Sequence, residues 1–222
     1  MAVNTENYLK IKEELANRGV ILVAVSKTKP VQDILKLYEL GQRDFGENYV
    51  QELCDKYEQL PKDIRWHFIG HLQSNKVKYI APFVHLVQGT DSAKLLAEIN
   101  KQGAKCNRVI PCLLQVHIAQ EETKFGFDED ELKQVQPEQY SHLRIDGLMG
   151  MASFTENLAV VRNEFKQLKT IFNQLPQLFS AASPILSMGM SGDYETAIEE
   201  GSNMVRIGSL LFGERQKGKI EK

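Results

Sequence analysis

The chain contains few cysteines, and their spacing fits neither a disulfide framework nor a metal site. Only three occur among the 222 residues, at positions 54, 106 and 112. An odd number of scattered cysteines is typical of a reducing compartment, where disulfides do not persist. We therefore expect a cytoplasmic protein in which these thiols have no catalytic role.

An excess of charge and a long apolar run are missing as well. Lysine and arginine number 27 and the acidic residues 29, which gives a formal net charge of -2. This balance provides no general attraction to nucleic acid or to anionic lipid. No apolar run approaches the roughly 20 residues of a membrane-spanning helix, and Met1–Glu6 lacks the basic and apolar parts of a secretory signal. Neither nucleic acid nor a membrane is expected as a partner.

What is present is an ordinary globular composition, 42% hydrophobic and 25% charged. A chain of this length fits one large domain or two small ones, and it can bury a sizeable core. We find no low-complexity tract and no linker, and glycine and proline are scattered as turn residues. The sequence therefore predicts a single domain over residues 1–222.

The first structural pattern is an apolar run followed by an amphipathic one. Val20–Lys27 is rich in β-branched residues and has no polar alternation, which is typical of a strand buried on both faces of a parallel sheet. Pro30 then opens the amphipathic stretch Val31–Leu40, and Gly41 follows it. This arrangement predicts a helix with proline near its start.

The same alternation continues along the chain. Further strands are predicted at Asp44–Asn48, Arg65–Gly70, Val84–Gln88, Val109–Ile118, Arg144–Met151, Ile185–Met190 and Met204–Ser209. Further helices are predicted at Glu6–Asn17, Tyr49–Leu60, Asn75–Ile80, Ser92–Lys101, Asp130–Gln136, Glu156–Leu175, Tyr194–Glu200 and Leu210–Glu214. Eight strands that each lead into a helix favour a closed (β/α)8 barrel, a TIM barrel, with one additional N-terminal helix, over an open sheet.

Lys27 is the leading candidate for a functional residue. It ends the first strand on the face shared by Val23 and Val25, at the end where barrels of this kind hold their active sites. Burial disfavours an ammonium ion and lowers its pKa, which gives the free amine that a Schiff base to an aldehyde requires. An exposed lysine at a strand end is the alternative.

Glycine and serine gather after the last two strands, where barrels often bind phosphate. Glycine permits a close backbone approach, and a serine hydroxyl can donate a hydrogen bond. The residues concerned are Gly189, Gly192, Gly208, Ser187, Ser191 and Ser209. Alternatively, Ser191 or Asp193 only caps the helix that follows.

Arg206 precedes Gly208 by two residues, so the two point to the same side. A guanidinium stays charged, so a pyridine nitrogen facing it must be an acceptor and remain unprotonated. Such a ring is a weak electron sink and stabilises a carbanion poorly. A salt bridge to a carboxylate is the alternative for Arg206. Asn48 follows the second strand and could bond a phenolic oxygen or the lysine, or simply form the turn.

The two histidines His67 and His71 do not predict a metal site. A spacing of four brings two ligands together on a helix, whereas these residues belong to a strand and the turn after it. The sequence around them offers no carboxylate at ligand spacing. We expect no bound metal.

The segments at the strand ends together resemble the family of pyridoxal phosphate homeostasis proteins, single-domain relatives of the alanine racemase N-terminal barrel (fold type III). The matching stretches are Ala24–Lys27 with Pro30, Phe45–Tyr49, Trp66–Lys76, Ser187–Ser191 and Val205–Gly208. They follow one another in order over nearly the whole chain.

The resemblance implies specific roles for these residues. Lys27 would carry pyridoxal 5'-phosphate (PLP) as a Schiff base, Arg206 would face the ring nitrogen, and Asn48 would lie near the ring edge. The Ser187–Ser191 loop and Gly208-Ser209 would hold the phosphate, with the donors left open among Ser187, Met190, Ser191 and Ser209.

The resemblance also implies a function in vitamin B6 homeostasis without established catalysis. Such a monomer would buffer PLP or deliver it to PLP-dependent apoenzymes, with effects on amino-acid and keto-acid balance. Alanine racemase takes its opposing tyrosine base from a second domain and a partner subunit, and this chain ends at Lys222. A PLP-dependent racemase and a Schiff-base aldolase without cofactor remain the alternatives.

Overall fold

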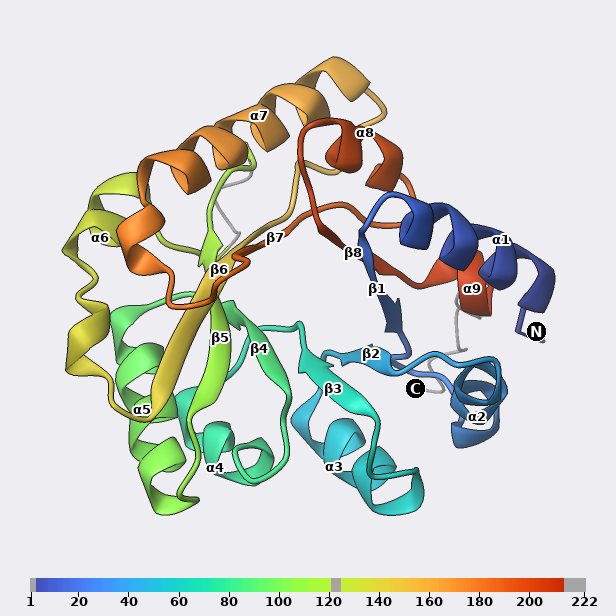
Figure 1. The fold of residues 1–222 in the computed structure, drawn as a ribbon, viewed down its shortest axis with the longest axis horizontal. Helices are drawn as coiled ribbons and strands as arrows, with labels where there is room; N and C mark the ends of the chain where they lie inside the picture. Colours follow the sequence, from blue (N-terminus) through green and yellow to red (C-terminus); the bar gives the residue numbers. More distant parts are fainter. Residues whose placement is uncertain (1–2, 121–124, 214–222) are drawn as a thin grey trace, which may run out of the picture.

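The computed structural model describes residues 3–120 and 125–213, which form a (β/α)8 barrel (Figure 1). Eight parallel strands close the sheet in the order of the sequence, with β8 beside β1. The strands are β1 (Ile21–Val25), β2 (Asp44–Glu47), β3 (Arg65–Phe68), β4 (Leu86–Thr90), β5 (Ile110–Val116), β6 (Leu143–Gly150), β7 (Ile185–Ser187) and β8 (Met204–Ile207). The predicted fold class is confirmed.

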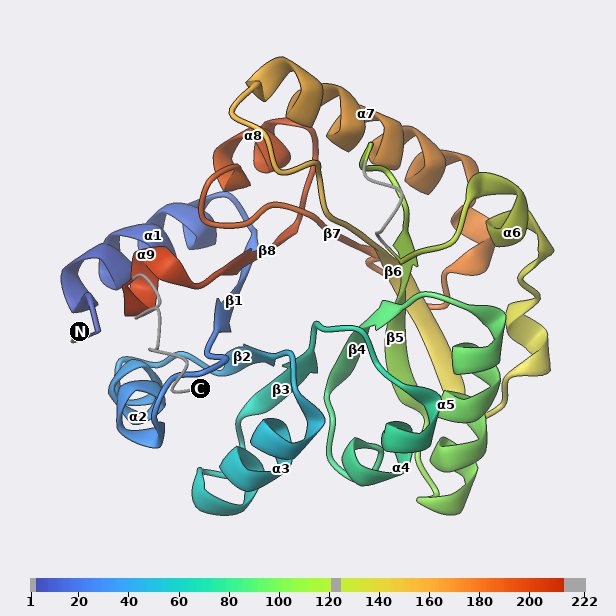
Figure 2. The ribbon, with the colours of Figure 1, turned by 180° about the vertical axis from the view of Figure 1, so that it is seen from behind.

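Helices surround the sheet on its outer side, as the view from behind also shows (Figure 2). They are α1 (Thr5–Asn17), α2 (Val31–Glu39), α3 (Val50–Gln59), α4 (Val77–Ile80), α5 (Ala93–Lys105), α6 (Glu129–Gln134), α7 (Leu158–Gln174), α8 (Tyr194–Glu199) and α9 (Ser209–Phe212). Short 3-10 turns lie at Ser74–Lys76, Pro137–Gln139 and Pro176–Leu178. Within the described ranges, no helix has both the length and the apolar character to cross a bilayer.

Side-chain caps fix the starts of several helices. Asn4 accepts a hydrogen bond from the N–H of Asn7 at the start of α1, and Ser92 caps α5 in the same way. Asp128 and Glu131 form a reciprocal capping box on α6. These bonds satisfy backbone donors that have no partner inside the helix, so the turn residues define where each helix begins.

Several predicted strands extend too far at their C-terminal ends. β7 stops at Ser187 because Gly189 adopts a positive φ of 97°, which turns the chain away from the sheet. Ser209 begins α9 instead of ending β8, so the helix predicted at Leu210–Glu214 starts one residue earlier. Glu214 lies outside the described residues. In addition, β4 is displaced by two residues from the predicted Val84–Gln88.

The sheet divides the apolar core into two parts. The larger part lies between strands and helices and includes fully buried aromatic side chains such as Trp66 and Phe165. The smaller part lies inside the barrel and consists of Val23, Leu86, Leu113, Met149 and Met204. Polar side chains are buried within the barrel as well, so its interior is a mixed environment that can orient charged groups.

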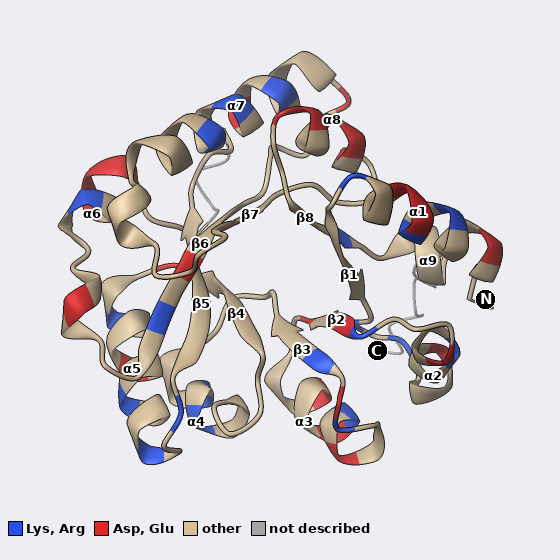
Figure 3. Ribbon diagram, in the orientation of Figure 1, with Lys and Arg blue, Asp and Glu red and all other residues tan. Residues whose placement is uncertain are grey.

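Charges of both signs cover the outer helices (Figure 3). Basic residues on α7 face acidic residues on α8, and Arg162 bonds Glu199 and Glu200 at 2.5 Å each. Such exposed pairs contribute little stability individually. Both colours occur on most of the labelled helices, which agrees with the balanced composition.

Candidate functional site

A cavity of about 470 Å³ opens at the C-terminal end of the barrel. Its walls come from segments that follow different strands. The lining residues are Val25, Lys27, Lys29, Asn48, Ile69, Met151, Phe154, Met190, Ser191, Gly192, Arg206, Gly208, Ser209 and Gly213. Seven of the eight predicted site residues are among them. Only Ser187 is absent from the lining.

Lys27 reaches this cavity because β1 directs alternate side chains inward. Val23 belongs to the apolar cluster inside the barrel, Val25 lines the cavity, and Lys27 continues the same face beyond the strand. The residue is half-buried. β1 ends two residues before Lys27, which leaves the partly buried side chain at the rim of the mouth.

Lys29 also lines the cavity, but its ammonium group has other partners. It donates hydrogen bonds to the carbonyl oxygens of Phe212 (2.9 Å) and Gly213 (3.1 Å). The last carbonyls of a helix have no intrahelical donor, and a lysine is a suitable partner for them. Lys29 thus ties the loop after β1 to the end of α9 and closes one side of the cavity.

Arg206 lies at the base of the cavity and is 3% exposed. Nη1 donates to the carbonyl oxygen (2.9 Å) and the hydroxyl (2.5 Å) of Ser187, and Nη2 donates to the carbonyl oxygen of Gly150 (3.0 Å). Among the described residues it forms no ion pair, so the salt-bridge alternative is not supported. Burial lowers the pKa of Arg206 to about 10, and the nearby charge of Asp193 partly opposes this shift. A cation therefore remains at the cavity floor at neutral pH.

Ser187 is fully buried beneath Arg206 instead of facing the cavity. Its hydroxyl donates to Oε1 of Gln88 at 2.7 Å while it accepts from Arg206. Both functions of the hydroxyl are therefore engaged within the protein. Ser187 orients the arginine in this structure, and the sequence pattern gave no sign of that because Gln88 is 99 residues away.

The two glycine-rich turns are bonded to each other. Oγ of Ser191 accepts a hydrogen bond from the backbone N–H of Gly208 at 3.2 Å. Asp193 takes the N-cap position of α8 without capping it by its side chain, and its carboxylate accepts from the N–H of Met190 at 2.5 Å instead. Gly192 is exposed, and a Cβ placed on it would meet no atom within 4 Å. Open space therefore adjoins the backbone at Gly192, whereas a Cβ on Gly208 would lie 3.3 Å from Val25.

Asn48 provides a buried polar atom that lacks a partner. Its Oδ1 is shielded from solvent and makes no hydrogen bond within the described residues. The turn that carries it packs against Gly70, where an added Cβ would lie 2.5 Å from the carbonyl oxygen of Asn48. Buried polar atoms are usually satisfied, so an unpaired amide that borders a cavity is typical of a ligand contact.

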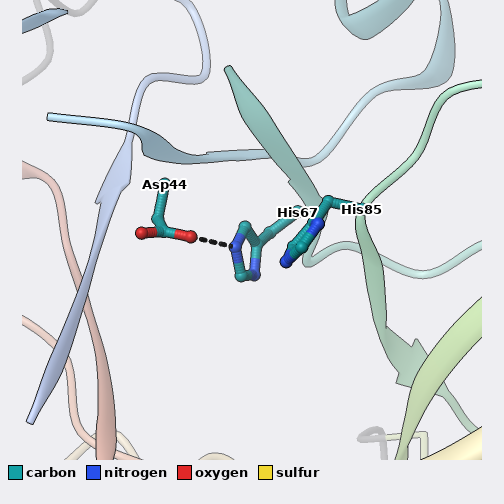
Figure 4. A group of neighbouring side chains, drawn as sticks. All are labelled: Asp44, His67 and His85. Atoms are coloured by element: carbon teal, nitrogen blue, oxygen red, sulfur yellow. Dashed lines mark hydrogen bonds and ion pairs between the residues drawn. The ribbon is translucent and has the colours of Figure 1, made fainter. Parts of the chain in front are cut away.

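A second, smaller cavity of about 240 Å³ lies at the N-terminal end of the barrel. Figure 4 shows His67 between Asp44 and His85, with a hydrogen bond to Asp44. Nε2 of His67 lies 3.0 Å from Oδ1 of Asp44, and the amide nitrogen of Gln88 lies 3.0 Å from Nδ1. Arg65 donates to both oxygens of the Asp44 carboxylate. The fold thus brings a carboxylate to His67 that the sequence did not indicate.

Asp44, His67 and Gln88 form a hydrogen-bonded unit, and the ring of His85 lies beside it. Because the Gln88 amide N–H faces Nδ1 of His67, the ring proton lies on Nε2 and is donated to Asp44. Both ring nitrogens are then occupied, and neither is directed at His85. The other histidine considered above, His71, is not part of this group. Its Nδ1 contacts the carboxylate of Asp91 at 2.7 Å. The two histidines point in different directions, as expected.

Known proteins share the sequence and the fold of this chain. Residues 4–216 match the family described as the alanine racemase N-terminal domain. A curated pyridoxal phosphate homeostasis protein of Aquifex aeolicus is 43% identical over 209 residues, which cover 91% of this chain and 92% of that protein. The structure of PipY from Synechococcus elongatus with PLP bound has a TM-score of 0.85 at 33% identity, covering 94% of this chain and 99% of that one. An alanine racemase from Bartonella henselae shares the fold, with a TM-score of 0.71 at 16% identity over 100% of this chain and 62% of that one.

Proposed function

Because the chain belongs to the family of pyridoxal phosphate homeostasis proteins, we propose that it binds PLP in the cavity at the C-terminal end of the barrel and attaches it to Lys27. In this proposal the protein is a cytoplasmic monomer that buffers the cofactor and delivers it to PLP-dependent apoenzymes. Amino-acid and keto-acid balance then depends on how much PLP it holds.

The residues around the cavity fit the chemistry of this cofactor. The unpaired Oδ1 of Asn48 marks a position where a polar ligand atom completes a buried amide. Of the Arg206 nitrogens, Nη1 and Nη2 are bonded to protein oxygens, and Nε makes no hydrogen bond within the described residues. Nε is therefore the donor that would meet a ring nitrogen. The turns at 190–192 and 208–209 both line the cavity, with open space beside Gly192, and would hold the phosphate.

When bound, PLP supplies an aldehyde that reacts with a primary amine and a ring that can accept electrons. Lys27 offers the amine at the rim, and Arg206 keeps its positive charge at the floor. A guanidinium beside the ring leaves no proton acceptor there, so the ring nitrogen stays unprotonated and the ring accepts electrons poorly. This arrangement favours retention of the cofactor over carbanion chemistry.

We also propose that the protein is not a racemase, because of which ionisable groups line the cavity. Among the described lining residues they are Lys27, Lys29 and Arg206, with no carboxylate, cysteine, histidine or tyrosine. Lys29 is engaged by two carbonyl oxygens. Racemisation requires a base on each side of the substrate carbon, and these residues offer no second base opposite Lys27.

The visible spectrum of the purified protein with added PLP tests this function. We expect an absorbance band that borohydride removes, with the label mapped by mass spectrometry to the peptide containing Lys27. Lys27→Ala should abolish the band and leave the circular dichroism of the barrel unchanged. Failure of the wild-type protein to take up PLP, or a label on another peptide, would contradict the proposal. Solvent deuterium incorporated at Cα of an amino acid would indicate a racemase instead. Labelling by a carbonyl substrate and borohydride without PLP would indicate an aldolase.

A further inference from the structure

The loop that carries Lys27 rests on three buried or partly buried ionic side chains, Glu47, Glu52 and Lys56, here called the loop anchor. Glu47 ends β2, and the other two lie on α3. We propose that the loop anchor positions Lys27 for its reaction with the aldehyde by fixing the residues before and after it. This inference rests on the function proposed above and adds residues that do not line the cavity.

Lys56 is the centre of the loop anchor. Its side chain is 6% exposed, and its ammonium donates to Oε1 of Glu47 (2.7 Å) and to Oε1 of Glu52 (2.6 Å). The third hydrogen bond goes to the backbone carbonyl oxygen of Ser26 (2.7 Å). A lysine ammonium has three donors, so every one is used. Lys56 therefore connects β2, α3 and the loop after β1.

The two carboxylates hold the positions on either side of Lys27. Oε1 of Glu47 accepts from the hydroxyl of Ser26 at 2.6 Å, and Oε1 of Glu52 accepts from the backbone N–H of Thr28 at 2.6 Å. Thr28 has a positive φ of 64°, a conformation that costs a β-branched residue energy and needs support from its surroundings. The backbone on both sides of Lys27 is thereby held while its side chain extends into the cavity.

Stability alone does not account for these charges. Glu47 is fully buried, and its Oε2 has no partner within the described residues. Burial raises the pKa of Glu47 to about 7, with the charge of Lys56 opposing the shift. A buried ionic cluster is often no more stable than apolar residues of similar volume, because desolvation offsets the attraction between the charges. The position of this cluster next to the loop that carries Lys27 fits a positioning role.

Positioning matters here because an amine must approach the aldehyde carbon along a defined direction. A displacement of about 1 Å in such a group can slow a reaction by about a hundredfold. The loop anchor limits that displacement by bonding the neighbours of Lys27 and not Lys27 itself. Its loss should therefore slow attachment of PLP more than it weakens the noncovalent contacts of the phosphate.

The test compares Glu52→Ala with Glu52→Gln, because Glu52 is the most exposed member of the loop anchor, with a side chain 23% exposed. Glutamine keeps an oxygen for the N–H of Thr28, and alanine does not. The measured quantity is the rate of labelling of Lys27 by PLP. In this reaction the Lys27 amine condenses with the aldehyde and releases water, and borohydride delivers a hydride to the resulting carbon. Glu58→Ala, an exposed site on the same helix, is the matched control.

We expect Glu52→Ala to slow labelling about tenfold or more, and Glu52→Gln to restore the rate to within about threefold of wild type. Glu58→Ala should react as wild type does. Glu47→Gln and Lys56→Met are further members of the series and are interpreted only where circular dichroism shows a folded barrel. Wild-type labelling rates in folded Glu52→Ala would overturn the inference. Absence of labelling in the wild-type protein would instead overturn the proposed function.

Discussion

The two ends of the barrel contain similar residue types in opposite states of pairing. At the N-terminal end, Arg65 is bonded to Asp44, and Arg144 to Asp146, each through two contacts. At the C-terminal end, Arg206 has no carboxylate in hydrogen-bond contact among the described residues. A paired cavity is largely neutral, whereas an unpaired cation and an orphaned amide form a site that a ligand can complete. The difference makes the C-terminal end the better candidate for the ligand site proposed above.

A chain of hydrogen bonds inside the barrel joins the two ends. Arg206 donates to Ser187, Ser187 donates to Gln88, Gln88 donates to His67, and His67 donates to Asp44. All donors point the same way, so the bonds polarise one another. The paired end therefore supports the orientation of the arginine at the open end.

The largest effect is expected for Arg206→Met. The substitution removes the arginine donor from the carbonyl oxygens of Ser187 and Gly150, at a cost of about 1–3 kcal/mol for each bond that is not replaced. Loss of a charged donor should also weaken PLP binding by about tenfold to a hundredfold. Denaturant unfolding and equilibrium titration with PLP measure the two effects.

Arg65→Met provides the matched change at the paired end. It removes an arginine whose side chain is 48% exposed, so it should reduce stability by about 1 kcal/mol and leave PLP affinity unchanged. Equal losses of affinity in the two variants would remove the functional distinction between the ends.

A smaller effect is expected for Gln88→Leu, which interrupts the chain between the ends. It leaves Nδ1 of His67 without a donor and the hydroxyl of Ser187 without its acceptor, and we expect a loss of about 2 kcal/mol in the free energy of unfolding. The absorption maximum of the PLP complex should shift because Arg206 loses its support. Gln102→Leu on α5 removes a glutamine bond to Glu98 outside the barrel and should not shift it. An unshifted spectrum in Gln88→Leu would show that the chain is only structural.

Asp44→Asn should change how stability depends on pH. Hydrogen bonds from Arg65 and His67 outweigh the effect of burial and hold the pKa of Asp44 well below its usual range. The carboxylate therefore stabilises the fold above its unfolded pKa, and this contribution is lost as the pH falls below about 4. We expect Asp44→Asn to be about 1–2 kcal/mol less stable at pH 7. Its acid unfolding should be shallower than that of wild type, and parallel curves would contradict the assignment.

The sequence predicts the barrel and most of the cavity because both follow from local patterns. Buried strands are apolar over their whole length, and their C-terminal ends converge whatever the loops contain. This rule predicted Lys27 and Gly208 as lining residues. It could also have predicted Ile69 and Met151, because they too follow strands. The buried contacts behind the cavity could not have been predicted from the sequence. Ser187 meets Gln88 across 99 residues, and Ser26 meets Lys56 across 30. No periodicity encodes such pairs.

The smallest effect on stability is expected for His85→Asn. This variant tests whether the N-terminal end of the barrel changes stability with pH without changing PLP affinity. Although His85 is exposed as a residue, desolvation of its ring in the cavity wall is the largest effect and lowers its pKa from 6.5 to about 4. A neutral His85 thus stabilises the fold above about pH 6.5, and that contribution is lost as the pH falls toward 4. Glu47 acts in the opposite sense, because its raised pKa reduces stability as the pH rises from 4.5 to about 7. The melting temperatures of His85→Asn and wild type should therefore be compared at each pH. We expect their difference to change between pH 7 and pH 5 in favour of the variant, with no change in PLP affinity. A constant difference would show that His85 has an ordinary pKa.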